Sequence, residues 1–182
     1  MRVSDADILI IPGLGGSGPD HWQSRWQARL STARRIEQDD WESASRSRWV
    51  ERIVGESQAS TRPTILVAHS LGVIAVAHAA PALAGVVAAF LVAPSDWERP
   101  GLIPGVRHDF APIPRDPLPF PTVLVASSND PFCEIGRASD LAEAWGSDFV
   151  DAGEAGHINA ESGHGPWPEG LMRFAGFLSK LA

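Results

Sequence analysis

Short apolar runs alternate along the chain with longer segments in which apolar and polar positions follow a helical period. Runs such as Ile8–Ile11 and Thr64–Ala68 are continuously apolar, which is typical of strands buried on both faces of a parallel sheet. The predicted strands are Asp7–Ile11, Arg34–Gln38 (weak), Thr64–Ala68, Val86–Ala93, Thr122–Ala126 and Asp148–Val150 (weak). The predicted helices are Asp20–Ser31, Ser43–Ser57, Leu71–Ala79, Arg137–Trp145 and Glu169–Leu181. This alternation predicts an α/β fold with about six strands in a mainly parallel sheet and helices on both faces.

Two segments depart from this pattern. Val73–Ala93 is apolar over the length of a membrane span, but Pro81 and Gly85 divide it and no basic cluster flanks it. We therefore interpret it as a buried helix followed by a central strand. Glu98–Pro121 is rich in proline and has no period. We interpret it as an ordered surface loop that either borders a site or is a passive connection.

Length and composition narrow the class of protein. The chain has 182 residues, 44% hydrophobic and 20% charged, which fits one globular domain over residues 1–182. Its net charge of −7 gives no electrostatic footprint for nucleic acid or for an anionic membrane. Cys133 is the only cysteine, so no internal disulfide is possible, and the acidic N-terminus does not resemble a signal peptide. We expect a cytoplasmic protein with no nucleic-acid or membrane partner.

The predicted strand Thr64–Ala68 leads into His69-Ser70-Leu71-Gly72 and then into an apolar helix. This matches the nucleophile elbow Gly-x-Ser-x-Gly, with Ala68 in place of the first glycine. Small residues are needed there because the serine lies on a sharp turn between strand and helix. The alternative is a serine that only caps the helix. The surrounding strand and helix favour Ser70 as a nucleophile.

A glycine-rich turn, Pro12-Gly13-Leu14-Gly15-Gly16-Ser17-Gly18, follows the first strand. In α/β-hydrolases such a turn supplies one backbone N–H to the oxyanion hole, and the residue after the nucleophile supplies the other. We assign these donors to Leu14 and Leu71, with Gly13 lining the pocket. The turn also satisfies the dinucleotide pattern Gly-x-Gly-x-x-Gly, and Asp39 and Asp40 follow roughly 20 residues later. No clean acidic end of the second strand supports that alternative, so it is weakened but stays open.

Candidate acid and base residues follow the last two strands. Asp130 comes after the fifth strand and His157 after the sixth, which gives the order Ser, Asp, His of α/β-hydrolases. The aspartate would fix the tautomer of the imidazole and stabilise its protonated form. Asp96, after the fourth strand, is the alternative acid and otherwise lines the pocket. His164 is the alternative base, and His69 is expected to pack beside the elbow at the pocket.

Several motifs together resemble one known family. They are Pro12–Ser17 with His21-Trp22, His69–Gly72, Ser128–Pro131, and Gly156–Asn159 with Gly165 and Trp167. The chain resembles the retinoblastoma-binding protein 9-like serine hydrolases, a compact branch of the α/β-hydrolases. The resemblance implies a small sheet without the antiparallel first hairpin, no lid domain, and a triad of Ser70, Asp130 and His157. It also implies substrates that are poorly defined. The protein binding in the family name corresponds to no motif here and is not transferred.

We expect an enzyme that cleaves small ester, thioester or amide bonds of an acyl substrate through an acyl-enzyme. No cluster has metal-ligand spacing, so no metal or other cofactor is expected. No segment is long enough for a lid, which predicts a shallow pocket and short acyl chains. The alternative is a non-catalytic protein-binding module on the same fold, using the seven tryptophans or the proline-rich loop. Most of these tryptophans lie on predicted helix faces, where packing is the simpler explanation.

Overall fold

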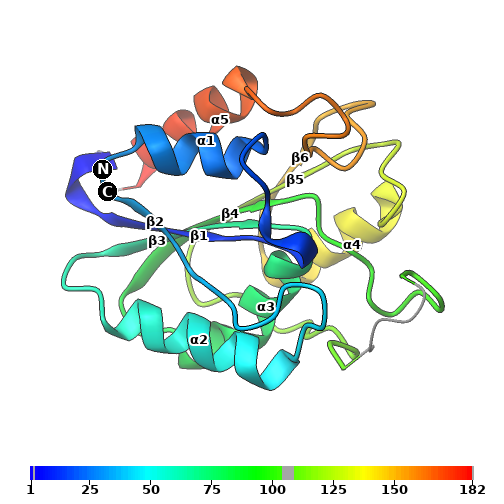
Figure 1. The fold of residues 1–182 in the computed structure, drawn as a ribbon, viewed down its shortest axis with the longest axis horizontal. Coiled ribbons are helices and arrows are strands. Elements are labelled where there is room, and N and C mark those ends of the chain that lie inside the picture. Colours follow the sequence, from blue (N-terminus) through cyan, green and yellow to red (C-terminus); the bar gives the residue numbers. More distant parts are fainter. Residues whose placement is uncertain (2, 104–108, 182) are drawn as a thin grey trace.

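The computed structural model describes residues 1, 3–103 and 109–181. Its described residues contain a sheet in which all neighbouring strands are parallel (Figure 1). The strands are β1 (Asp7–Ile11), β2 (Ala33–Arg35), β3 (Thr64–His69), β4 (Val86–Val92), β5 (Thr122–Ala126) and β6 (Asp148–Asp151). Their spatial order is β2-β1-β3-β4-β5-β6, so the chain runs from β1 to the edge strand β2 and then adds β3 to β6 in sequence on the other side of β1. In such open sheets, loops at the carboxyl ends of the strands form the binding edge.

Helices cover both faces of this sheet. They are α1 (Trp22–Arg29), α2 (Arg46–Gln58), α3 (Leu71–Ala79), α4 (Ile135–Trp145) and α5 (Pro168–Lys180), with short 3₁₀ turns η1 (Val3–Asp5), η2 (Leu14–Gly16) and η3 (Ala80–Ala82). Helices α1 and α5 lie on one face, and α2, α3 and α4 lie on the other (Figure 1). Alternate strand residues therefore enter different cores: Ile8 and Ile10 face α1 and α5, whereas Leu9 and Ile11 face the opposite layer. This explains why the strands are apolar without alternation.

The predicted α/β-hydrolase fold is confirmed, with the sheet parallel throughout its described strands rather than mainly parallel. The predicted span Arg34–Gln38 is wrong in extent, because β2 covers only Ala33–Arg35 at the edge of the sheet. The Ile36 N–H still donates to the Ile10 carbonyl at 2.9 Å, and the Ile36 side chain is buried. After Ile36 the chain no longer pairs with the edge of the sheet, and strand propensity alone does not predict where that pairing ends.

Helix α2 begins at Arg46 and not at Ser43 as predicted. The carboxylate of Asp40 accepts the N–H groups of Glu42 and Ser43, at 2.9 and 2.8 Å, and this holds the segment in a turn. The Arg46 N–H donates to the carboxylate of Asp109 at 3.1 Å, a contact from a distant part of the chain. The start of the helix is therefore fixed by a local turn and a tertiary contact.

The long apolar stretch Val73–Ala93 divides as predicted into a helix, α3, and a central strand, β4. Among the described residues, no helix has both the length and the apolar character to cross a bilayer. The described parts of Glu98–Pro121 form a loop, and some of its apolar side chains, including Phe110 and Phe120, are buried in the layer of α2, α3 and α4. Residues 104–108, with Pro104 and His108, lie outside the described residues.

Candidate active site

Ser70 lies at the turn between β3 and α3, with φ 57° and ψ −125°. A positive φ is costly for a residue with a side chain, and such strain is typical of functional turns. The Ser70 N–H donates to the Val92 carbonyl at 3.1 Å, which ties the turn to the neighbouring strand. The Ser70 side chain makes no capping hydrogen bond to α3, so the geometry does not support a serine that only caps the helix.

The elbow depends on a very close approach between α3 and the end of β1. A Cβ at Gly72 would lie 2.5 Å from the Ile11 carbonyl oxygen and 2.6 Å from that of Pro12. These are backbone atoms and cannot move aside, so glycine is required at this position. Ala68, which replaces the first glycine of the motif, is fully buried in β3.

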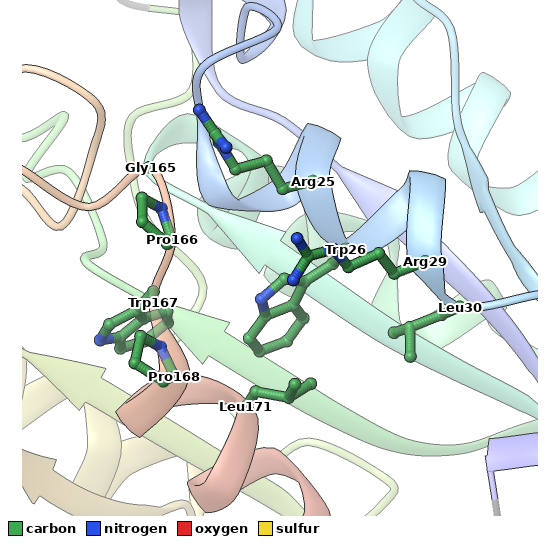
Figure 2. Close-up of a pocket in the computed structure, with 9 residues that line it drawn as sticks. All are labelled: Arg25, Trp26, Arg29, Leu30, Gly165, Pro166, Trp167, Pro168 and Leu171. Atoms are coloured by element: carbon green, nitrogen blue, oxygen red, sulfur yellow. The ribbon is translucent and has the colours of Figure 1, made fainter.

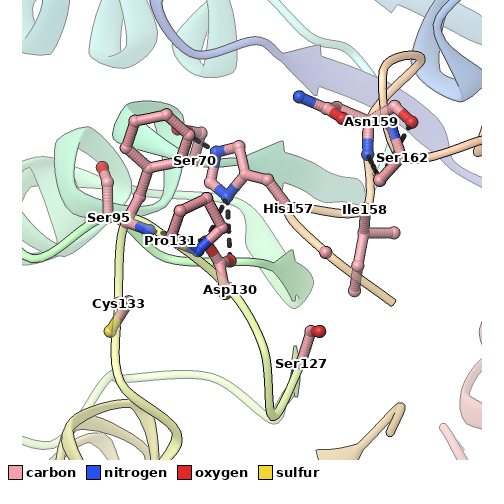
Figure 3. A network of polar contacts seen from close by, with 12 residues as sticks. Ser70, Ser95, Ser127, Asp130, Pro131, Cys133, His157, Ile158, Asn159 and Ser162 are labelled. Atoms are coloured by element: carbon pink, nitrogen blue, oxygen red, sulfur yellow. Dashed lines mark hydrogen bonds and ion pairs between the residues drawn. The ribbon is translucent and has the colours of Figure 1, made fainter. Parts of the chain in front are cut away.

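The structure brings Ser70, His157 and Asp130 together (Figure 3). The Ser70 Oγ lies 2.9 Å from the His157 Nε2, and the His157 Nδ1 lies 2.8 and 3.0 Å from the two Asp130 carboxylate oxygens. The His157 and Asp130 side chains are only 8% and 2% exposed. With the carboxylate accepting Nδ1–H, Nε2 is free to accept the serine hydroxyl proton.

Neighbouring polar groups fix the positions of the two loops that carry Asp130 and His157. The Asp130 Oδ1 also accepts the Phe132 N–H at 2.9 Å. The Asn129 Oδ1 accepts the Ser127 hydroxyl at 2.9 Å and the Gly156 N–H at 2.6 Å, so it connects the loop after β5 to the loop before His157. Asn129 is not among the predicted site residues, although it stands beside the candidate acid in a motif that carries the family resemblance.

Two neutral histidines lie behind His157. The His69 Nε2–H donates to the His157 backbone carbonyl at 2.9 Å, and the two rings are 4.8 Å apart. The His21 ring contacts His69 from the other side at 4.7 Å. Burial, with a smaller effect of His157, lowers the pKa of His21 to about 3 and that of His69 well below its usual value. His69 was expected at the pocket; it is 4% exposed and supports the base loop from behind.

The candidate oxyanion donors lie in the turn facing the elbow. A Cβ at Gly13 would come 2.7 Å from the Ser70 Cβ and 3.1 Å from the Leu71 nitrogen, so this turn touches the serine. Within the described part of the chain, the N–H groups of Leu14 and Leu71 donate to no other residue. They are free to bind a ligand oxygen.

The glycine-rich turn is held from behind. The Gly15 N–H donates to the Trp41 carbonyl at 3.1 Å, and the Arg35 guanidinium donates to the carbonyl of Ser17 at 3.1 Å and to that of Gly16. The wholly buried Gln23 amide donates to the carbonyls of Ile11 and Val67, at 3.2 and 3.1 Å, and so joins the ends of β1 and β3. No local signal marks Gln23, because its partners are distant in sequence.

The alternative acid and base have other partners. Asp96 forms an ion pair with Arg137 at 3.3 Å, and its carboxylate accepts the Glu98 N–H. The Asp96 N–H donates to the carbonyl of Phe132, so this residue lies beside the acid loop. The His164 Nδ1 lies 3.1 Å from the Ser162 hydroxyl. Ser70 is thus contacted by His157 and not by His164. The His157 imidazole is contacted by Asp130 and not by Asp96.

The geometry also weakens the dinucleotide alternative. The pyrophosphate would lie at a helix N-terminus directly after the glycines, but α1 begins only at Trp22. Asp39 forms an ion pair with Arg52, and Asp40 holds a turn, both well beyond the end of β2. Among the described residues, no three His, Cys, Asp or Glu side chains form a group that could hold a metal ion.

Comparisons with known proteins agree with this architecture. A family model described as serine hydrolase matches residues 8–176. A YdeN-like hydrolase from Pectobacterium atrosepticum is 41% identical, with 98% of this chain and 94% of that chain covered and a TM-score of 0.89. The ydeN gene product of Bacillus subtilis is 20% identical, with 96% and 100% covered and a TM-score of 0.80. Esterase 2 of Thermogutta terrifontis, at 14% identity, covers 100% of this chain and 86% of its own, with a TM-score of 0.70. No curated protein matches. The family match and the first of these structures show that the chain belongs to the serine hydrolase family.

Proposed function

We propose that this hydrolase cleaves small ester, thioester or amide bonds through an acyl-enzyme, with Ser70 as nucleophile, His157 as base and Asp130 as the orienting acid. One observation carries the proposal. The Ser70 Oγ, both ring nitrogens of His157 and the Asp130 carboxylate form a continuous chain of hydrogen bonds of 2.8 to 3.0 Å. This is the geometry that activation of a serine by an imidazole requires.

In the proposed reaction, the His157 Nε2 accepts the hydroxyl proton while the Ser70 Oγ attacks the carbonyl carbon of the substrate. The imidazolium that forms is stabilised by the buried Asp130 carboxylate, and it then protonates the leaving alcohol, thiol or amine. Water enters in the second half of the reaction, loses its proton to His157 and releases the acid from Ser70. No residue outside these three needs to change its protonation state.

The negative charge of the tetrahedral intermediate needs donors on the other side of the carbonyl. The free N–H groups of Leu14 and Leu71 are suited to that role, because the Gly13 turn packs directly against Ser70. Rigid donors are effective because they need no reorganisation during the reaction, and losing one typically costs on the order of a hundredfold or more in rate.

A shallow groove of about 280 Å³ runs between the turn with Leu14 and Gly15 and the residues after His157, Asn159 to Glu161. Leu14, one of the proposed oxyanion donors, lines this groove, although Ser70 itself does not, and the groove has room for a small substrate group. We therefore propose acetate- to butyrate-sized acyl chains rather than long ones. A series of nitrophenyl esters tests this part: kcat/KM should fall from butyrate to decanoate, and a rise with length would refute it.

Labelling with a fluorophosphonate tests the nucleophile. Esterase 2 of Thermogutta terrifontis is phosphorylated by paraoxon and phosphonylated by cyclosarin, and this supports the choice of an organophosphorus probe. Ser70 should carry the label, and Ser70→Ala should abolish labelling while circular dichroism stays unchanged. Ser95→Ala, which removes a serine bonded to Trp97, should label normally. An unlabelled native protein, or a label on Ser95, Ser127 or Ser162, would contradict the proposal; the first result would favour the non-catalytic binding module.

Two finer assignments belong to the same proposal. The motifs around Ser70, Asp130 and His157 support a place in the retinoblastoma-binding protein 9-like branch, and the single buried Cys133 suits the cytoplasm. Cell fractionation would test the second of these.

A further inference from the structure

A second concave site lies between α1 and α5, away from the residues proposed for catalysis. It has a volume of about 180 Å³, and neither Ser70, Asp130 nor His157 lines it. Trp26 and Trp167 form its floor, Leu30 and Leu171 form apolar walls, and Arg25 and Arg29 stand at its rim (Figure 2). Nothing in the proposed reaction uses this pocket.

Close packing holds the floor of this α1–α5 pocket in a fixed shape. The indoles of Trp26 and Trp167 are stacked, with centroids 6.0 Å apart and an interplanar angle of 14°. Trp26 in turn packs on Phe174 at 5.5 Å. A Cβ at Gly170 would lie 2.2 Å from the Trp167 ring, so glycine is what lets this indole lie against the first turn of α5. Trp26 and Trp167 are only 5% and 6% exposed, so a ligand would meet the small accessible part of a preformed aromatic surface.

The size of the pocket selects small ligands. An engineered apolar cavity of about 150 Å³ binds benzene, so the α1–α5 pocket has room for one aromatic ring with a short substituent. The walls already expose apolar surface to water, since Leu171 is 40% exposed. Covering that surface favours binding of a ring.

The charges at the rim select an anion. Arg25 and Arg29 are one helical turn apart on α1, and no acidic side chain lines the pocket. Arg25 is partly engaged, with its Nη2 3.1 Å from the Asp20 carboxylate. Arg29 has no hydrogen-bond or ion-pair partner within the described part of the chain. On a protein with a net charge of −7, an unpaired guanidinium above an aromatic floor is a local cationic feature.

We propose that the α1–α5 pocket is a binding site for a small aromatic carboxylate. The ring would lie against the Trp26 and Trp167 indoles, and the carboxylate would be held by Arg29 with help from Arg25. A guanidinium matches a carboxylate with two parallel hydrogen bonds, which a neutral amide cannot reproduce. One ligand would thus contact the apolar walls with its ring and the unpaired Arg29 guanidinium with its carboxylate.

The test is an NMR titration of the full chain with 4-fluorophenylacetate and, in parallel, its neutral amide. The indole N–H signals, assigned by single Trp→Phe variants, are the reporters. Trp26 and Trp167 should shift on addition of the acid, while Trp49 and Trp145 on the opposite face of the sheet should not. Affinity for so small a ligand is expected on the order of 1 mM. The acid should bind more tightly than the amide.

Variants separate this site from the catalytic one, which would also meet carboxylates as products. Arg29→Gln should weaken acid binding about fivefold and bring the acid and the amide to similar affinity. Arg52 is an exposed arginine on α2 that forms an ion pair with Asp39, and Arg52→Gln is the matched control. This variant should change neither the affinity for the acid nor the preference for the acid over the amide. Ser70→Ala should retain binding, whether or not Ser70 proves to be the nucleophile. The proposal would be overturned if shifts were confined to signals around His157, or if the acid and the amide bound equally well. It would also be overturned if the signals shifted with protein concentration in the absence of ligand, which would indicate that a second copy of the chain covers this face.

Discussion

Replacing Asp130 by asparagine tests the proposed acid at a single atom. The Asp130 Oδ1 accepts the Phe132 N–H at 2.9 Å, and the Oδ2 lies 2.8 Å from the His157 Nδ1. An asparagine that keeps its oxygen on the Phe132 N–H presents its NH₂ group to Nδ1. That nitrogen must then accept, so the proton moves to Nε2, which can no longer take the proton of Ser70. The loop keeps its shape while the base is held in the wrong tautomer.

The expected loss follows from the burial of the pair. Because the Asp130 side chain is only 2% exposed, water does not replace the lost counter-charge of the imidazolium. For a serine–histidine–aspartate arrangement this change costs about ten-thousandfold in kcat, equivalent to about 5.4 kcal/mol in the barrier. We expect a loss of that order in kcat/KM for nitrophenyl acetate, with an unchanged circular dichroism spectrum.

Asp96→Asn is the matched control. Asp96 is paired with Arg137, which keeps its bond to Glu98 when the charge at position 96 is removed. Its effect on the reaction is indirect and partly screened, so kcat/KM should stay within about threefold of the native value. If Asp96→Asn is inactive while Asp130→Asn retains near-native activity, the acid is on the loop after β4. If neither variant loses activity, the proposed three-residue mechanism is wrong.

Three further results are expected. Gly72→Ala should destabilise the fold by about 3 kcal/mol and remove activity, since the new Cβ would meet the Ile11 carbonyl oxygen. Gly176→Ala, on the exposed face of α5, is the control and should stabilise the fold by about 0.5–1 kcal/mol. Equal midpoints of urea unfolding for the two variants would refute this reasoning. Burial raises the pKa of the Cys133 thiol to about 12, so about one molecule in ten thousand is a thiolate at pH 8, and mass spectrometry should find iodoacetamide adducts only after unfolding. Folding lowers the pKa of His21 to about 3 from 6.5, so the unfolded chain binds its proton first. Stability from this group is complete above pH 6.5 and is lost as the pH falls toward 3, by about 2 kcal/mol at pH 5. The His21 Nδ1 accepts the Gln23 N–H at the start of α1, and His21→Asn keeps an acceptor there. This variant should reduce the difference between urea unfolding at pH 7 and pH 5 by about 2 kcal/mol, leaving the part that comes from the buried His69, and an unchanged difference would count against the burial argument.

Local sequence patterns predicted the strands and helices because each buried strand carries its own signal. The apolar runs of β1, β3 and β5 were located within a residue of their ends, since both faces of these strands are covered. The edge strand β2 and the start of α2 were placed wrongly. Their limits are set by contacts, such as Asp109 on Arg46, that no local window contains.

At the candidate site, too, local patterns predict some residues and contacts between distant residues determine the others. Ser70, Asp130 and His157 could be proposed from order and spacing, because a parallel sheet gathers the ends of its strands at one edge. The residues that hold them could not. Asn129 joins two loops through backbone groups, and Gln23 joins β1 to β3 from a helix that had no assigned role. Hydrogen bonds to distant carbonyls leave no period in the sequence.

These supporting contacts explain how a small fold can keep a strained serine in place. The positive φ of Ser70 persists only if its surroundings leave no relaxed alternative. Two contacts hold this turn: Gly72 lies directly against the backbone of Ile11 and Pro12, and the Ser70 N–H donates to the Val92 carbonyl. His69, the residue before Ser70, donates to the His157 carbonyl and so connects the turn to the loop that carries His157. Because burial lowers the pKa of His69, this ring stays neutral, and in the proposed mechanism it would support His157 without placing a second positive charge beside the His157 imidazolium. A lysine or arginine could make the same bond to the carbonyl, but its charge would oppose the proton transfer on which the proposed mechanism depends.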